Sequence, residues 1–424
     1  MPLVGARQFS PPVDASRIIP YSSAMHWETL ARELSVSTPS KIVLFVMDGI
    51  GGLPVDGQTE LERSRHPNLD ELARRGTAGL TDPVFRGITP GSGPAHLGLF
   101  GYDPLRYQLG RGIHEALGSA VDVGPQDLVA RGNYATLKDG RVTDRRAGRI
   151  PTSECEKLCA RLNDRLKEVD GVKVSLYPGK EHRFVVKFSG EGLDDRLADA
   201  DPQKDHKPPV PAKALVPEAG RAARAVNAFI DEATRLLADV PVANTILLRG
   251  FSKFPAIPSM IELYKLKPSA IANYPMYKGL ARLLGMEVMN VGGGTADLID
   301  ALEIHYDEFD FFYIHFKKTD STGEDGNYEA KVDAIEEVDA FIPRITSLKP
   351  DVLVVTSDHS TPALLKGHSW HPNPFLLVSP TALPDTLSRF TERECARGLL
   401  GRFESIYAMP LMLAHAGKLK KYGA

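Results

Sequence analysis

The chain of 424 residues is poor in cysteine and tryptophan and contains no long apolar run. No run approaches the roughly 18 apolar residues that a membrane span needs. The first residues, Met1 to Arg7, lack the apolar middle region of a signal peptide. The formal net charge of -3 gives no electrostatic argument for binding nucleic acid or an anionic membrane. We therefore expect a cytoplasmic protein with no nucleic-acid or membrane partner.

The three cysteines fit a reducing compartment. Cys155 and Cys159 are four residues apart, so they share one face if their segment is helical. A redox or metal-binding pair is one interpretation. Two small buried side chains on an amphipathic helix are the simpler one, which we favour. Cys395 has no partner that the sequence reveals.

Length and composition indicate a soluble protein of two or three domains. Apolar residues make up 42% of the chain and charged residues 25%, which is ordinary for a globular protein. Before residue 120 and after residue 275, apolar runs of strand length alternate with helical patterns, which indicates a mostly parallel sheet with helices on both faces. These patterns include a strand over 287–291 and a long amphipathic helix over 328–345. We expect a discontinuous core of residues 36–120 and 275–424, with residues 1–35 as an N-terminal arm.

Residues 121–274 differ in composition, with many charged and turn-forming residues, and we expect an inserted substrate-binding or lid domain there. Arg149, Arg183 and Arg249 each lie beside a predicted strand or turn in this segment. Arginine is the preferred side chain for bidentate recognition of carboxylate or phosphate. Any one of these arginines alone reads as surface charge, but several in one insert suggest an anion-binding site.

The apolar strand at 353–355 runs directly into candidate metal ligands. Asp358 and His359 follow it, and His368 and His371 come before the next apolar run. In open α/β sheets, ligands bind beyond the carboxyl ends of the strands. A single histidine is more often a core residue than a ligand, but this cluster favours a metal site. Asp48 follows the apolar run 41–47 in the same way, as a ligand or as a turn residue before glycine.

Ser92 lies between two glycines, Gly91 and Gly93, immediately before an apolar helical stretch. That arrangement exposes a hydroxyl at a helix N-terminus, where backbone N–H groups and the helix dipole favour an incoming phosphate. The serine can also be a simple helix cap. Because a cap does not need glycine on both sides, we favour a nucleophile.

Several motifs in combination resemble one known family. The segments Thr89-Pro90-Gly91-Ser92, Phe100-Gly101-Tyr102-Asp103-Pro104, Asp144-Arg145-Arg146-Ala147-Gly148-Arg149 and Asp358-His359-Ser360-Thr361-Pro362 resemble cofactor-independent phosphoglycerate mutases of the archaeal type, a branch of the alkaline phosphatase superfamily. The resemblance covers most of residues 40–415. It implies an alkaline-phosphatase-like core with an inserted smaller α+β domain, and two divalent metal ions near a nucleophilic serine.

The resemblance also implies roles for single residues. One metal would be held by Asp48, Asp358, His359 and Ser92, and the other by Asp320, His368 and the residue four after Asp320. That residue is histidine in the family and Glu324 here, which favours Mn²⁺ or Mg²⁺ over Zn²⁺. Gly93 also departs from the family, which has an acid after the nucleophile. His371 is a further candidate ligand or a donor to one.

The implied reaction interconverts 3-phosphoglycerate and 2-phosphoglycerate through phosphoserine at Ser92. Lys278 would neutralise charge on the transferring oxygens, and Arg149, Arg183 and Arg249 would hold the carboxylate and phosphate. A phosphohydrolase with water as acceptor is the alternative on the same fold. A binding protein that has lost its second metal is a third possibility, supported by Glu324 and Gly93.

Overall fold

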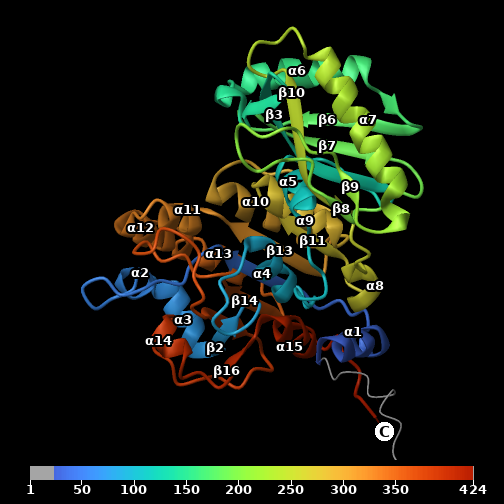
Figure 1. The fold of residues 1–424 in the computed structure, drawn as a ribbon. Coiled ribbons are helices and arrows are strands. Elements are labelled where there is room, and N and C mark those ends of the chain that lie inside the picture. Colours follow the sequence, from blue (N-terminus) through green and yellow to red (C-terminus); the bar gives the residue numbers. More distant parts are fainter. Residues whose placement is uncertain (1–22, 424) are drawn as a thin grey trace, which may run out of the picture.

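The computed structural model describes residues 23–423, which form two main sheets. Figure 1 shows the larger sheet with its helices in the lower part of the molecule and the second sheet above it. Among the described residues, no helix combines the length and apolar character needed to cross a membrane.

The larger sheet has eight strands in the order β12-β11-β13-β1-β14-β15-β2-β16. Every neighbouring pair is parallel except the two pairs that β15 makes. The mostly parallel sheet expected from the sequence is therefore confirmed. Its strands are β1 Ile42–Met47, β2 Thr77–Asp82, β11 Pro268–Ile271, β12 Glu287–Val288, β13 Phe311–Phe316, β14 Val352–Thr356, β15 Asn373–Val378 and β16 Gly401–Glu404.

Helices cover both faces of this sheet, as expected, because β1 alternates its side chains between two cores. Ile42, Leu44 and Val46 belong to one apolar cluster, and Val43 and Phe45 belong to the other. The first face is covered by α1 Ser23–Leu34, α4 Ser92–Leu99, α5 Arg111–Gly118, α8 Met260–Tyr264, α9 Pro275–Leu283 and α15 Ala408–His415. The second is covered by α2 Glu60–Arg63, α3 Pro67–Arg75, α10 Thr295–His305, α12 Tyr328–Asp339, α13 Ile342–Ser347 and α14 Glu392–Cys395.

The second sheet is antiparallel, with strand order β10-β3-β7-β6-β5 and β4 paired to β3. Its strands are β3 Asp127–Lys138, β4 Arg141–Asp144, β5 Glu168–Val169, β6 Val172–Pro178, β7 Arg183–Ser189 and β10 Thr245–Lys253. Helices α6 Thr152–Arg165 and α7 Gly220–Leu236 pack on one face and share an apolar core with it. Val129 and Val185, from the opposite face, belong to the core around α5.

Three details of the sequence interpretation were wrong. The expected helix over 328–345 is interrupted between α12 and α13, where Pro343 enters the first turn of a new helix. The expected strand over 287–291 ends at Val288. Strand β11, inside the segment assigned to the insert, pairs with β13 of the larger sheet, so an insert boundary at residue 274 is too late.

Candidate active site

The ends of three adjacent parallel strands bring three buried aspartates together. Asp48 follows β1, Asp358 lies two residues beyond β14, and Asp320 lies in α11 (Lys318–Glu324), which follows β13. The register places the last residue of β1 beside Phe316 of β13, and Val46 beside Thr356 of β14. All three carboxylates are fully buried. The sheet topology therefore concentrates negative charge at one point of its carboxyl edge.

Asp48, Asp358 and His359 form the first group that could hold a metal ion, with one ligand atom from each lying within 4.8 Å of the others. The His359 Nε2 atom is 3.4 Å from Asp48 Oδ1 and 3.1 Å from Asp358 Oδ2. Both carboxylate oxygens are buried and have no hydrogen-bond partner. Because buried unpaired oxygens are unfavourable, their convergence on one imidazole nitrogen fits a divalent cation with oxygen and nitrogen ligands.

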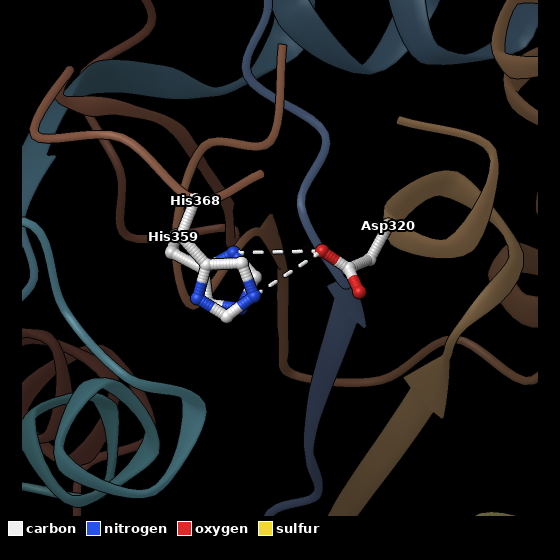
Figure 2. Close-up of side chains that lie close together, drawn as sticks. All are labelled: Asp320, His359 and His368. Carbon is white, nitrogen blue, oxygen red and sulfur yellow. Dashed lines mark ion pairs between the residues drawn. The ribbon is translucent and has the colours of Figure 1, made fainter. Parts of the chain in front are cut away.

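Asp320, His359 and His368 form a second group of the same kind. Figure 2 shows both imidazoles stacked and facing the Asp320 carboxylate. The His368 Nε2 and His359 Nδ1 atoms are 3.6 and 3.9 Å from Asp320 Oδ1. The Glu324 carboxylate is 3.8 Å from His368 Nε2, and the side chain is 53% exposed. Glu324 therefore lies at the open side of this group, while His359 is common to both groups.

Thr361 links the two groups. Its hydroxyl donates to Asp320 Oδ1 at 2.5 Å and lies 3.0 Å from His359 Nδ1. This contact orients the His359 ring so that Nε2 faces the first group. Gly49, with a φ of 67°, passes so close that a side chain there would lie 2.6 Å from the Thr361 hydroxyl oxygen. A glycine is needed at this turn for both its backbone angle and its lack of a side chain.

Ser92 is the first residue of α4, with Gly91 as its N-cap. Its hydroxyl is 3.3 Å from His359 Nε2, the nitrogen that also faces Asp48 and Asp358. His96, one turn later, lies 2.9 Å from the Ser92 carbonyl oxygen and 3.3 Å from Asp358 Oδ2. The structure thus brings the predicted nucleophile to the first metal group.

The charges in this cluster depend on one another. Burial, followed by the charges of Asp48 and Asp320, raises the pKa of Asp358 well above its usual value. Burial also acts to raise the pKa of Asp48, but a hydrogen bond from His315 and the charges of His359 and Lys317 lower it overall. The carboxylates of this cluster therefore favour a protonated Asp358 unless a bound cation balances their charge.

Lys317, which the sequence interpretation did not select, is the lysine at this site. Its ammonium lies 3.1 Å from Asp48 Oδ2 and 2.5 Å from Asp320 Oδ2. The Tyr277 hydroxyl donates to Asp48 Oδ2 at 2.6 Å and lies 3.3 Å from the Lys317 ammonium. Lys278, the lysine predicted to assist, follows Tyr277 on α9, and within residues 23–423 it makes no ion pair with these carboxylates.

Arg149, Arg183 and Arg249, from three separate segments, line one cavity of about 190 Å³. The other lining residues are Arg131, Asn133, Arg145, Arg146 and His182. Buried Nε atoms of Arg183 and Arg249 have no hydrogen-bond partner. The wall is therefore strongly cationic and has unused donors, which suits an anion with several oxygens.

Two further candidates lie outside the metal groups. His371 Nδ1 lies 3.0 Å from the Ser369 hydroxyl, and its ring stacks on Trp370. Cys155 and Cys159 are buried in the core of the second sheet, where the Cys155 thiol donates to the Arg183 carbonyl oxygen at 3.1 Å. These surroundings fit the simpler interpretation of the cysteine pair as small core side chains.

Comparisons with known proteins point to one family. A family model described as "2,3-bisphosphoglycerate-independent phosphoglycerate mutase" matches residues 73–243. A Thermosipho africanus protein named "Probable 2,3-bisphosphoglycerate-independent phosphoglycerate mutase" is 54% identical, over 92% of this chain and 98% of its own. A Thermus thermophilus protein of the same name is 53% identical, over 93% and 98%. The solved "Cofactor-Independent Phosphoglycerate Mutase from Thermoplasma acidophilum" has a TM-score of 0.75 at 32% identity, covering 89% of this chain and 100% of that one.

Proposed function

Because the chain belongs to the 2,3-bisphosphoglycerate-independent phosphoglycerate mutase family, we propose that it interconverts 3-phosphoglycerate and 2-phosphoglycerate through a phosphoserine at Ser92. The observation that carries this proposal is the position of the Ser92 hydroxyl. It lies beside His359 Nε2, where unpaired oxygens of Asp48 and Asp358 converge. A hydroxyl held at a cation site is a usable phosphoryl acceptor.

Two divalent cations, Mn²⁺ or Mg²⁺ rather than Zn²⁺, would supply charge neutralisation for the phosphoryl oxygens and a lower pKa for the Ser92 hydroxyl. Asp48, Asp358, His359 and Ser92 would hold one of them. Asp320, His368 and Glu324 would hold the other. The carboxylate-rich donor set supports Mn²⁺ or Mg²⁺ over Zn²⁺.

The protein side chains perform the remaining tasks. Ser92 attacks the phosphoryl group of 3-phosphoglycerate, and the released glycerate turns so that its 2-hydroxyl takes the phosphoryl group back. Burial acts to lower the pKa of Lys317, but the charges of Asp48 and Asp320 raise it overall, so the ammonium stays charged and would neutralise charge on the transferring oxygens. Lys278 stays a predicted second cation for this task.

The arginine cavity would hold the carboxylate of the substrate while its phosphoryl group reacts. Its size of about 190 Å³ suits a three-carbon acid, and its unused guanidinium donors support this role. We further propose that the second sheet with α6 and α7 is an inserted domain that closes on the metal centre. Closure would hold glycerate in the active site and exclude water while the glycerate turns.

The alternative is a phosphohydrolase that uses the same serine and transfers the phosphoryl group to water. The test is incubation with 3-phosphoglycerate and Mn²⁺, Mg²⁺ or Zn²⁺ in turn, with coupled enolase detection of 2-phosphoglycerate and a parallel assay for inorganic phosphate. A mutase forms 2-phosphoglycerate with little phosphate release. Phosphate release without 2-phosphoglycerate would replace the proposal with the hydrolase.

Replacing Glu324 with histidine should change the preferred metal. The substitution removes one negative charge beside His368, so Mg²⁺ should bind more weakly and Zn²⁺ relatively better. We expect the ratio of Mg²⁺- to Zn²⁺-supported activity to fall about tenfold, equivalent to ~1.4 kcal/mol. Glu329→His on α12 is the control, and an unchanged ratio in the Glu324 variant would show that this carboxylate does not bind the ion.

Replacing Arg183 with methionine should weaken substrate binding more than it slows turnover. Loss of a charge-assisted hydrogen bond costs about 1.5–3 kcal/mol, so the KM for 3-phosphoglycerate should rise roughly 10- to 100-fold. Arg344→Met is the matched control, because that arginine pairs with Asp300 and Glu303 at the surface. A normal KM in the Arg183 variant would show that this cavity does not bind the substrate.

A further inference from the structure

Gly93, the residue after the predicted nucleophile, is packed against the imidazole of His114. A side chain on Gly93 would overlap the Cε1 atom of His114 and lie 3.1 Å from its Nε2 and 3.3 Å from its Nδ1. Gly93 is buried in the first turn of α4, whereas His114, on α5, is partly exposed. The glycine after Ser92 therefore leaves room for an imidazole one residue from the nucleophile.

Other imidazoles near Ser92 are already engaged. His96 contacts the Ser92 carbonyl oxygen, and His315 lies 3.0 Å from Asp48 Oδ2. His359 and His368 belong to the two metal groups. In the part of the chain that the structure describes, the His114 ring makes no hydrogen bond or ion pair. Its ring nitrogens are not among the buried polar atoms that lack a partner, so solvent or a ligand can reach them. Both ring nitrogens are thus available to a ligand.

The helix that carries His114 also touches the arginine cavity. Glu115, the next residue, pairs with Arg131 of the cavity at 3.7 Å. A side chain on Gly112 would lie 2.5 Å from the Gly250 carbonyl oxygen and 2.6 Å from that of Val129, so α5 packs directly on β10 and β3. Figure 1 shows α5 between the two sheets. Helix α5 therefore contacts both the turn that carries Ser92, through His114, and the arginine cavity, through Glu115.

We propose that His114 is a catalytic residue that carries the protons of the mutase reaction, an inference that rests on the proposed function. As the Ser92 Oγ–P bond forms and the P–O3 bond of 3-phosphoglycerate breaks, His114 takes the Ser92 hydroxyl proton and delivers it to O3. When O2 of the turned glycerate attacks phosphoserine, His114 takes the 2-hydroxyl proton and returns it to Ser92 Oγ. The serine hydroxyl and the neutral imidazole are both restored, so each turnover balances.

The resting state of the ring agrees with this sequence of transfers. Burial lowers the pKa of His114 below its usual value, so the imidazole is neutral near pH 7 and able to accept a proton first. The geometry, rather than this shift, selects the residue, because its ring packs on Gly93 beside Ser92 and the next residue on its helix pairs with Arg131 of the arginine cavity.

The first test is His114→Gln, which keeps a polar side chain of similar reach but cannot carry a proton. We expect kcat for 3-phosphoglycerate to fall about 100- to 1,000-fold, within the range for general acid–base catalysis, while KM changes less than about threefold. His305→Gln, at the end of α10, is the control and should leave both constants unchanged. A kcat within threefold of wild type, or a change confined to KM, would overturn the proposal.

A second test separates proton transfer from packing. In His114→Ala, added imidazole should raise the activity of the variant at least tenfold, because the free base can enter the space left by the ring. Loss of activity without such rescue would contradict a proton-carrying role. Gly93→Ala should displace the ring and lose kcat to a similar extent, with no further loss in the double variant. If wild type forms 2-phosphoglycerate but these variants do so normally, only the His114 inference fails. If wild type forms none, the proposed function itself fails.

Discussion

Ser92→Ala is expected to reduce mutase turnover by at least about 10⁴-fold, because the substitution removes the hydroxyl that we propose to carry the phosphoryl group. The variant lacks one oxygen atom, and alanine is a good helix former, so α4 should be retained. The measurement is coupled enolase detection of 2-phosphoglycerate with the preferred metal. Mass spectrometry after rapid quenching should find one phosphate on Ser92 in wild type and none in the variant.

Ser347→Ala is the matched control, because this serine is exposed at the end of α13, which precedes the amino end of β14, whereas the site lies beyond the carboxyl end of that strand. It should retain full activity. Substantial turnover by Ser92→Ala, with a normal melting temperature, would show that phosphoryl transfer does not pass through this hydroxyl. The metal groups would then have to activate a different nucleophile.

The positions of the three aspartates could be predicted from the sequence because one rule governs them all. Buried parallel strands read as continuous apolar runs, and the residues just beyond their carboxyl ends meet at one edge of the sheet. Asp48, Asp320 and Asp358 obey this rule, and the register of β13, β1 and β14 brings them together. Ser92 was found by a different local signal, its two flanking glycines.

The groups that surround these ligands could not be predicted in the same way. His315 lies within the apolar strand Phe311–Phe316 and reads as a core residue, yet its ring is 3.0 Å from Asp48. Tyr277 reads as part of an amphipathic helix. Lys317 does carry a signal, since it follows β13 directly, but the sequence interpretation favours Lys278. Which lysine faces the site depends on packing between α9 and β13, which periodicity does not specify.

The arginine cavity shows the same limit. The register of the second sheet pairs Arg249 with Arg131 and Arg183 with Asn133, so residues from β10, β3 and β7 meet. A shift of one residue in either pairing would move these side chains to the opposite face. The sequence reveals a surplus of arginine in this segment, but the cavity exists only because of register. Arg131 was missed for this reason.

Loss of the Asp358 charge is expected to weaken metal binding and to preserve or raise the stability of the metal-free protein. The raised pKa of Asp358 means that metal-free protein is stabilised by its protonated form and loses this stability as the pH rises toward the folded-state pKa. Near neutral pH, an ionised Asp358 beside Asp48 and Asp320 would therefore destabilise the metal-free fold, whereas a protonated Asp358 would not. An added cation reverses this effect.

Asp358→Asn should therefore abolish metal binding at the first metal group without lowering the stability of the metal-free protein. Asparagine has nearly the same shape and no charge, so in EDTA the variant should melt at the same temperature as wild type or higher. With Mn²⁺ present, wild type should gain stability by mass action and the variant much less. Elemental analysis should show a loss of about one bound ion, and mutase activity should fall at least about 10³-fold because the Ser92 hydroxyl loses its activating cation.

Asp339→Asn is the control for this experiment, because Asp339 is also a buried aspartate but accepts hydrogen bonds from the backbone of α3. It should lower the melting temperature with and without Mn²⁺ and keep the wild-type metal content. Equal metal content in wild type and Asp358→Asn would exclude Asp358 as a ligand. A lower melting temperature of Asp358→Asn in EDTA would show that its charge is already neutralised within the protein, and the unpaired oxygens beside His359 would need another explanation.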